Sequence, residues 1–170
     1  MEQEAVHLSA DEKSVVVLDQ SALPGQVRWL ELATLDGMTD AIRTLKVRGA
    51  PSIGICAAYG WYVLARQRSG LAWEEFCREM GLCREVLASA RPTAVNLTWA
   101  LDRMARAAQG VRDVAQAVER LGQECRAIHQ EEVRRSQRIA QLGLTLLRDG
   151  DGVLTHCNAG PLAASGLGTA

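Results

Sequence analysis

The stretch Arg48-Gly-Ala-Pro-Ser-Ile-Gly-Ile-Cys-Ala-Ala-Tyr-Gly-Trp-Tyr-Val-Leu-Ala-Arg66 shows how the chain is divided into elements. Arg48-Gly49-Ala50 interrupts the helical pattern that precedes it. Pro51 suits the first turn of a helix, where its missing N–H is not needed. Residues Ile53 to Arg66 then continue as an apolar helix. We therefore expect a helix that begins directly after Arg48-Gly49-Ala50.

Upstream of this helix, the pattern predicts a small sheet. Ser14–Asp19 is a β-branched run and Gln26–Leu32 alternates apolar and polar residues, so both are typical of strands. Pro24-Gly25 in the link between them favours a turn. We expect an antiparallel hairpin, to which residues near Val6–Leu8 could add a third strand.

Helical patterns account for most of the remaining chain. Thr34 can cap a helix that runs to about Val47. Further helices are expected over Trp73–Ala88, from a Thr93 cap to about Ala108, and over Val114–Leu147. The apolar stripe of the last helix contains Glu132 and Arg135, although interior charges are costly unless paired. A bend or solvated stretch is one interpretation, and a charged pair that faces a site or a domain boundary is the other.

A change of architecture is expected after the turn at Arg148–Gly152. Val153–His156 is typical of a buried strand and leads into a small-residue helix. A strand, a glycine-bearing turn and a helix form the first step of a doubly wound sheet. We therefore predict two domains. Residues 1–148 would form a helical domain with a small antiparallel sheet. Residues 149–170 would form the poorly anchored start of a truncated Rossmann-like domain.

Composition and charge argue against several classes of function. A net charge of −1 offers no basic face for nucleic acid. No apolar run approaches the ~20 residues of a membrane span, and the N-terminus is unlike a signal peptide, so a cytoplasmic location is expected. The five cysteines form no CxxC pair and the three histidines lack metal-ligand spacing. We therefore expect no metal site, and mostly free, buried cysteines.

Three segments carry candidate chemistry, and each ends one element and opens a helix: Val47–Gly54, Arg91–Leu97 and Thr155–Leu162. Helix N-termini attract anions. Gly49 would let the backbone approach a ligand, and Arg48 could hold a phosphate. Arg91 repeats this arrangement. The plainer alternative for both arginines is a surface position beside an ordinary helix turn.

Cys157 stands between the predicted strand and the following helix, where ligands bind in open α/β sheets. A cysteine at a helix N-terminus tends to have a lowered pKa, which suits proton transfer. The neighbouring His156 would point the opposite way along a strand. The alternative is a buried cysteine at a tight turn.

In this order, the three segments resemble the methylthioribose-1-phosphate isomerases. The broader family joins these enzymes to the ribose-1,5-bisphosphate isomerases and to regulatory subunits of the translation-initiation guanine-nucleotide exchange factor. The resemblance begins near Val17-Leu-Asp-Gln20 and includes Asp40–Arg43 and Ala57–Gly60. It covers nearly the whole chain except the N-terminal tail and the stretch around Ser69–Leu87. Arg91–Leu97 and the Cys157 turn favour the methylthioribose branch.

The resemblance implies an α/β protein overall, with the substrate between a helical N-terminal domain and a Rossmann-like C-terminal domain. It implies that Arg48, Gly49 and Ala50 lie in a substrate-binding loop, that Arg91 contacts the substrate phosphate, and that Cys157 is a catalytic acid/base. A second catalytic residue, an Asp, and an Asn-Lys substrate-binding pair are expected downstream of residue 170.

The implied function is conversion of 5-methylthioribose 1-phosphate to 5-methylthioribulose 1-phosphate in methionine salvage. The intact protein would be an aldose–ketose isomerase, homodimeric and without a cofactor, acting by proton transfer or by a hydride shift. Residues 1–170 alone are expected to be inactive. One alternative is an isomerase of ribose 1,5-bisphosphate or deoxyribose phosphate. The other is a non-enzymatic sensing or scaffold subunit.

Overall fold

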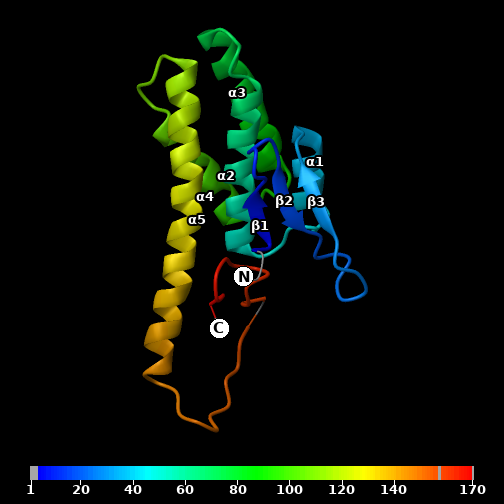
Figure 1. Cartoon of the computed structure of the whole chain (residues 1–170), viewed down its shortest axis with the longest axis vertical. Helices are drawn as coiled ribbons and strands as arrows, with labels where there is room; N and C mark the ends of the chain where they lie inside the picture. The colour runs from blue at the N-terminus through cyan, green and yellow to red at the C-terminus, as the bar shows by residue number, and fades with distance from the viewer. Residues whose placement is uncertain (1–3, 157, 170) are drawn as a thin grey trace.

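The computed structural model describes residues 4–156 and 158–169. Within these residues, three strands are followed by five helices (Figure 1). None of these helices is long and apolar enough to cross a bilayer.

The three strands form one antiparallel sheet in the order β1-β2-β3, which confirms the predicted hairpin and its third strand. Their bounds are Val6–Leu8, Val15–Leu18 and Trp29–Leu32. The central strand β2 is buried at all four positions. In β3, Leu30 and Leu32 contact the core while Glu31 is exposed. This alternation is the expected pattern of a strand that has one solvated face.

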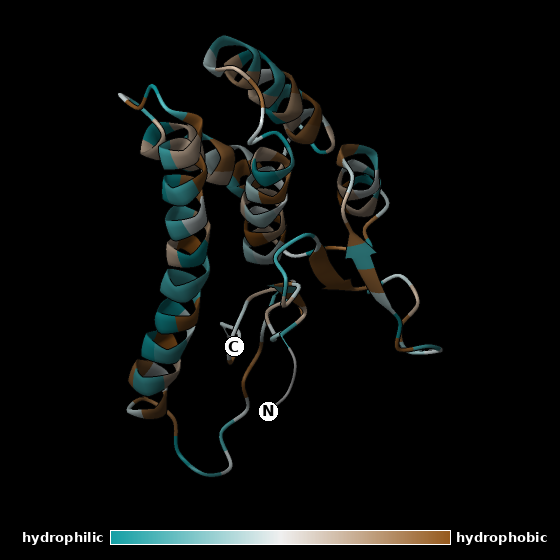
Figure 2. Ribbon diagram, turned by 45° about the horizontal axis from the view of Figure 1, so that its top comes forward, coloured by the Kyte–Doolittle hydropathy of each residue, from teal (hydrophilic) through white to brown (hydrophobic). Residues whose placement is uncertain are grey.

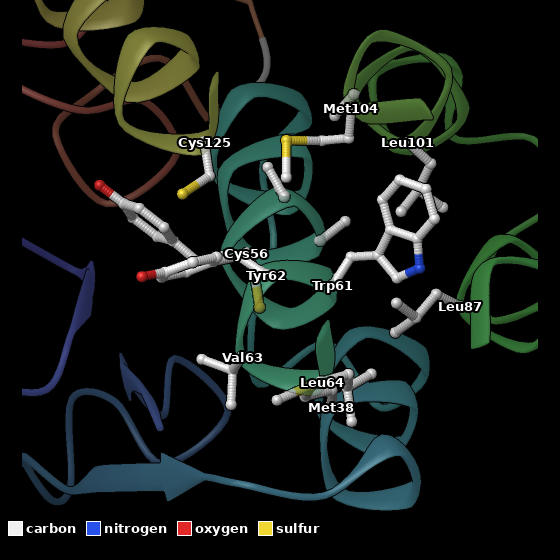
Figure 3. Close-up of a cluster of buried hydrophobic side chains, with 14 of the residues drawn as sticks. Met38, Cys56, Trp61, Tyr62, Val63, Leu64, Leu87, Leu101, Met104 and Cys125 are labelled. Carbon is white, nitrogen blue, oxygen red and sulfur yellow. The ribbon is translucent and has the colours of Figure 1, made fainter. Parts of the chain in front are cut away.

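The helix that follows Arg48-Gly49 is the centre of the molecule. This helix, α2, spans Ala50–Gln67, and every residue from Ser52 to Ala65 is buried. It contacts strands β1 and β2 and all four other helices, which are α1 (Leu35–Arg43), α3 (Trp73–Ser89), α4 (Val95–Ala107) and α5 (Val114–Leu144). Figure 3 shows side chains of α1, α3, α4 and α5 around Trp61, Tyr62 and Leu64 of α2. The core is therefore built around one apolar helix.

Two helix ends differ from prediction. Thr34 does cap α1, since its Oγ1 accepts a hydrogen bond from the Gly37 N–H at 3.2 Å. However, α1 ends at Arg43 and not near Val47, because Leu45 has a positive φ of 63°. Thr93 is not the cap of α4. The helix begins after Ala94, which makes no side-chain capping bond.

The last helix, α5, runs without interruption through Glu132 and Arg135 and ends at Leu144. Most of its residues are hydrophilic, with hydrophobic residues at intervals along the ribbon (Figure 2), as expected for a helix that buries one face. After α5 the chain returns along an extended path towards the start of α2 (Figure 1). At the charged pair the helix is continuous, and the Arg135 side chain is 56% exposed whereas that of Glu132 is 7% exposed.

The predicted strand at Val153–His156 and the helix after it do not form in the described residues. Val153 is 62% exposed and Leu154 is 97% exposed, and residues 161–167 form turns. A parallel strand requires neighbouring strands, and none lies beside these residues. Within the C-terminal segment that is expected to be poorly anchored, Ala163, Ala164 and Ser165 are buried.

Four cysteines lie in the described residues, and all four are free. Cys56, Cys83 and Cys125 are buried, as expected for packing residues, whereas Cys77 is exposed on α3. Burial raises the pKa of Cys56 and of Cys125 to about 12. These two thiols are therefore protonated and unreactive at neutral pH.

Candidate active site

Two of the three predicted segments meet at the first turn of α2. Gly49 precedes this turn with a φ of 95° and lies directly against Ala163. A Cβ atom at position 49 would be 2.4 Å from the Ala163 Cα. The absence of a Cβ at Gly49 therefore allows the chain's own backbone to approach closely, and the predicted approach of a ligand stays a prediction.

Hydrogen bonds attach residues 162–163 to α2. The Ser52 N–H donates to the Ala163 carbonyl at 3.1 Å, and the Ser52 hydroxyl donates to the Leu162 carbonyl at 3.3 Å. The Gln20 amide donates to the same Leu162 carbonyl at 2.6 Å. One of the donors at the α2 N-terminus, the Ser52 N–H, is therefore already satisfied by the chain itself.

Arg48 is exposed and lines an open cavity of about 370 Å³ together with Gln20, Leu23, Pro24 and Leu162. Within the described residues, no carboxylate pairs with Arg48. Its guanidinium is therefore available to an anion, as the sequence predicts for a phosphate contact.

The remaining segment, Arg91–Leu97, leads into α4 and lies at the same end of α2. A Cβ on Gly54 would be 3.0 Å from the Asn96 carbonyl, so the first turns of α2 and α4 are in close contact. Arg91 is half-buried and lies four residues before α4 begins. It also pairs with no carboxylate in the part of the chain that the structure describes. The predicted arginine segments thus lie at neighbouring helix starts.

The charged pair on α5 faces this region. Glu132 is only 5% exposed, and its Oε2 accepts a hydrogen bond from Arg135 Nη1 at 2.5 Å. Both side chains line a small cavity with Pro51 of α2 and with Asn96 and Trp99 of α4. The pair therefore borders the start of α2, and its interpretation as a pair that faces a site stays a prediction.

Cys157, the predicted acid/base, lies outside the described residues, so its role stays a prediction. Its neighbours are described: His156 is exposed and Asn158 is half-buried. Residues 162–163, five to six positions further on, are fixed against α2.

The sequence does not single out Gln20, which stands only at the end of the Val17-Leu-Asp-Gln20 resemblance and has no predicted role. In the structure it is 7% exposed and contacts both the Arg48 loop and the segment that follows Cys157. No local pattern indicates this, because its partners are backbone carbonyls.

The helical domain with its antiparallel sheet is a known architecture. It is similar to 5-methylthioribose 1-phosphate isomerase from Pyrococcus horikoshii, with a TM-score of 0.90 and 33% identity over 97% of this chain and 46% of that one. It is also similar to the translation initiation factor eIF-2B subunit delta from A. fulgidus, with a TM-score of 0.87 and 34% identity over 98% of this chain and 48% of that one.

Sequence comparison points to the same group of proteins as the structural comparison. The model of the Initiation factor 2 subunit family matches residues 46–167, and the chain belongs to this family. It is 44% identical to methylthioribose-1-phosphate isomerase of Symbiobacterium thermophilum over 98% of its length. It is 42% identical to 5-deoxyribose 1-phosphate isomerase of Bacillus thuringiensis over 100% of its length. The chain spans about half the length of these relatives, 47% and 50% respectively. The predicted resemblance is confirmed.

Proposed function

We propose that the intact protein containing this chain is an aldose–ketose isomerase that converts 5-methylthioribose 1-phosphate to 5-methylthioribulose 1-phosphate in methionine salvage. The observation that supports this most directly is the meeting of the three segments at the start of α2. They bring a glycine loop, the turn after Cys157 and two arginines that pair with no carboxylate among the described residues to neighbouring helix starts. The isomerases named above are similar over nearly the whole chain.

In this proposal, each part of the site has a distinct task. Arg48 and Arg91 hold the dianionic phosphate, and the backbone at Gly49 and Ala50 borders the sugar. Cys157 accepts or delivers a proton, together with an acid partner downstream of residue 170. The C2–H bond breaks and a C1–H bond forms while the ring C1–O bond opens; the C2 hydroxyl gives up its proton and the ring oxygen takes one, so the reaction balances without an external oxidant. Both a proton transfer and a hydride shift satisfy this balance.

A second substrate is also proposed, because the Bacillus relatives named for 5-deoxyribose 1-phosphate match the full length of the chain. That sugar phosphate lacks the methylthio group. Binding energy from an apolar pocket for the methylthio group would favour one substrate over the other by about 10- to 200-fold per added methylene-sized group. Comparing kcat/KM for the two substrates decides between them.

We further propose that the intact protein is a cytoplasmic homodimer and that residues 149–170 begin a second, Rossmann-like domain. The exposed apolar side chains of Val153 and Leu154 support the second part, since they are available for burial by further strands. A non-enzymatic regulatory subunit remains the alternative, given the similarity to the subunit delta structure. Turnover by the intact protein would exclude it.

The test is a Cys157→Ser variant of the intact protein, assayed with both sugar phosphates. Loss of an acid/base group lowers kcat by about 10²- to 10⁴-fold. Cys77→Ser is the matched control, because Cys77 is an exposed thiol on α3, and its kcat should equal that of the wild type. A Cys157→Ser enzyme that keeps more than half of the wild-type kcat would exclude the catalytic role.

A further inference from the structure

Gln20 connects two segments that the proposed reaction needs. Its Nε2 lies 2.6 Å from the Leu162 carbonyl oxygen and 3.5 Å from the Arg48 carbonyl oxygen. Leu162 follows Cys157 by five residues, and Arg48 is the proposed phosphate contact. The shorter of the two hydrogen bonds is thus on the side of the proposed acid/base, and the longer one is on the side of the phosphate.

The position of Gln20 is itself fixed by its neighbours. Its backbone N–H donates to the Lys46 carbonyl at 3.0 Å, just before the Arg48 loop. The preceding residue, Asp19, is fully buried and accepts hydrogen bonds from Ser21 and Arg28. With its main chain held on both sides, the amide of Gln20 is presented to the two carbonyls in a set orientation.

The side chain makes its hydrogen bonds only through its donor group. Gln20 is 7% exposed, and its Oε1 has no hydrogen-bond partner among the described residues. A buried amide whose acceptor oxygen is unsatisfied is destabilising. Pure packing would be served better by an apolar side chain of the same size, so the amide's donor function accounts for this residue type better than its bulk does.

We infer that Gln20 is a positioning residue of the proposed isomerase, and that its amide holds the segment after Cys157 at a fixed separation from the Arg48–Ala50 loop. The inference rests on the proposed function. An acid/base and a phosphate-binding loop must be placed together to well within 1 Å, because a displacement of that size costs about 100-fold in rate. Since the shorter hydrogen bond reaches Leu162, the main effect of losing it falls on kcat.

The chemistry of the donor predicts a rank order among substitutions. Gln20→Met keeps the length and loses both hydrogen bonds. Gln20→Glu places a carboxylate, which only accepts, against two carbonyl oxygens, and this arrangement is repulsive at neutral pH. The expected order of kcat is therefore wild type, then Met, then Glu. A residue that acted through volume alone would tolerate Glu, which has the same shape, as well as it tolerates Met.

The experiment uses the intact protein with Gln20→Met and Gln20→Glu. Gln67→Met is the matched control, because the Gln67 amide also donates to a carbonyl, that of Ala33 at 2.7 Å, at the opposite end of α2. We expect Gln20→Met to lower kcat by about 10- to 100-fold with KM changed by less than that, and Gln67→Met to leave both unchanged. Unchanged kcat and KM in both Gln20 variants, with a lower melting temperature, would overturn the inference.

Two further measurements separate this inference from the proposed function and from misfolding. If the wild type turns over neither sugar phosphate, the proposed function fails. The alkylation rate of Cys157 by iodoacetamide and the hydrogen exchange of the Ser52 amide still report on the attachment. Both rates should change in Gln20→Met and stay the same in Gln67→Met. If neither rate changes in Gln20→Met, Gln20 does not hold the segment after Cys157, and the inference is overturned. If Gln20→Glu does not fold, Ser52→Ala replaces it. That variant loses the weaker bond to the Leu162 carbonyl and should show a smaller fall in kcat, whereas an unaltered kcat in both Ser52→Ala and Gln20→Met contradicts the inference.

Discussion

Gly49 and Ala163 lie in direct contact across the site, so close that a Cβ atom on Gly49 would be 2.4 Å from the Cα of Ala163 and 2.6 Å from its carbonyl oxygen. The φ of Gly49 is also positive, at 95°, a conformation that other residues rarely adopt. Backbone geometry and lack of space therefore both exclude a side chain at position 49.

Gly49→Ala should consequently destabilise the protein by about 1–3 kcal/mol, since both strain and a clash with backbone atoms oppose it. Gly81→Ala is the control, because Gly81 is an exposed residue within α3 and a Cβ there would meet nothing within 4 Å. That control should stabilise the protein by up to about 1 kcal/mol. Urea unfolding of both variants checks the prediction, which fails if Gly49→Ala is as stable as the wild type.

Replacement of Arg48 or Arg91 by Ala should raise KM by about tenfold or more, because a hydrogen bond to a charged group contributes about 1.5–3 kcal/mol. The melting temperature should change little, since neither side chain pairs with a carboxylate in the described residues. Steady-state kinetics of the intact protein measure this, with exposed Arg120→Ala of α5 as the control. A large fall in melting temperature at constant KM would show a structural role.

The Glu132–Arg135 pair should respond asymmetrically to mutation. Arg135→Met leaves the carboxylate of Glu132, which is buried, without its partner, and the expected loss of stability is about 1–3 kcal/mol. Glu132→Gln leaves the Arg135 side chain, which is 56% exposed, in contact with water, and should cost less than about 1 kcal/mol. Chemical unfolding at pH 7 compares the two. Equal losses would mean that the burial of Glu132 does not matter.

Asp19 should make stability depend on pH in the acid range. Burial raises its pKa, but hydrogen bonds from Ser21 and Arg28 outweigh this effect and hold the pKa below the ordinary value of 3.8. The unfolded chain therefore binds the proton first, so the stabilisation from Asp19 is fully present above pH 3.8 and is lost as pH falls through the lower, folded-state pKa. Urea midpoints of wild type and Asp19→Asn should differ at pH 6 and converge below pH 3.8. A constant difference would contradict the prediction.

Local patterns predicted the elements where burial follows from nearby residues. The β-branched run at Ser14–Asp19 and the alternation at Gln26–Leu32 became β2 and β3, and the apolar run after Pro51 became the buried helix α2. The pattern at Val153–His156 was equally apolar but did not become a strand. An apolar run indicates a tendency to be buried, whereas a strand also needs a neighbouring strand, and the described residues supply none there.

The candidate site was predictable only in part, because some of its residues contact partners that lie far away in the sequence. Arg48, Gly49 and Arg91 stand next to helix starts in the sequence, so their surroundings can be inferred locally. The burial of Glu132 depends on Pro51 and Asn96, which belong to other helices. The function inferred for Gln20 depends on carbonyl groups, which every residue possesses, so no sequence pattern distinguishes its partners.

The hydrogen bond between Gln20 and Leu162 also has a consequence for how the protein folds. Its partners are 142 residues apart in the chain, and nearly all of the helical core lies between them. The entropy of closing so long a loop opposes this contact until α2 and its neighbouring helices have formed. We therefore expect the core to fold first and the proposed site to be assembled last. Substitutions at Gln20 should accelerate unfolding while leaving the folding rate of the core almost unchanged.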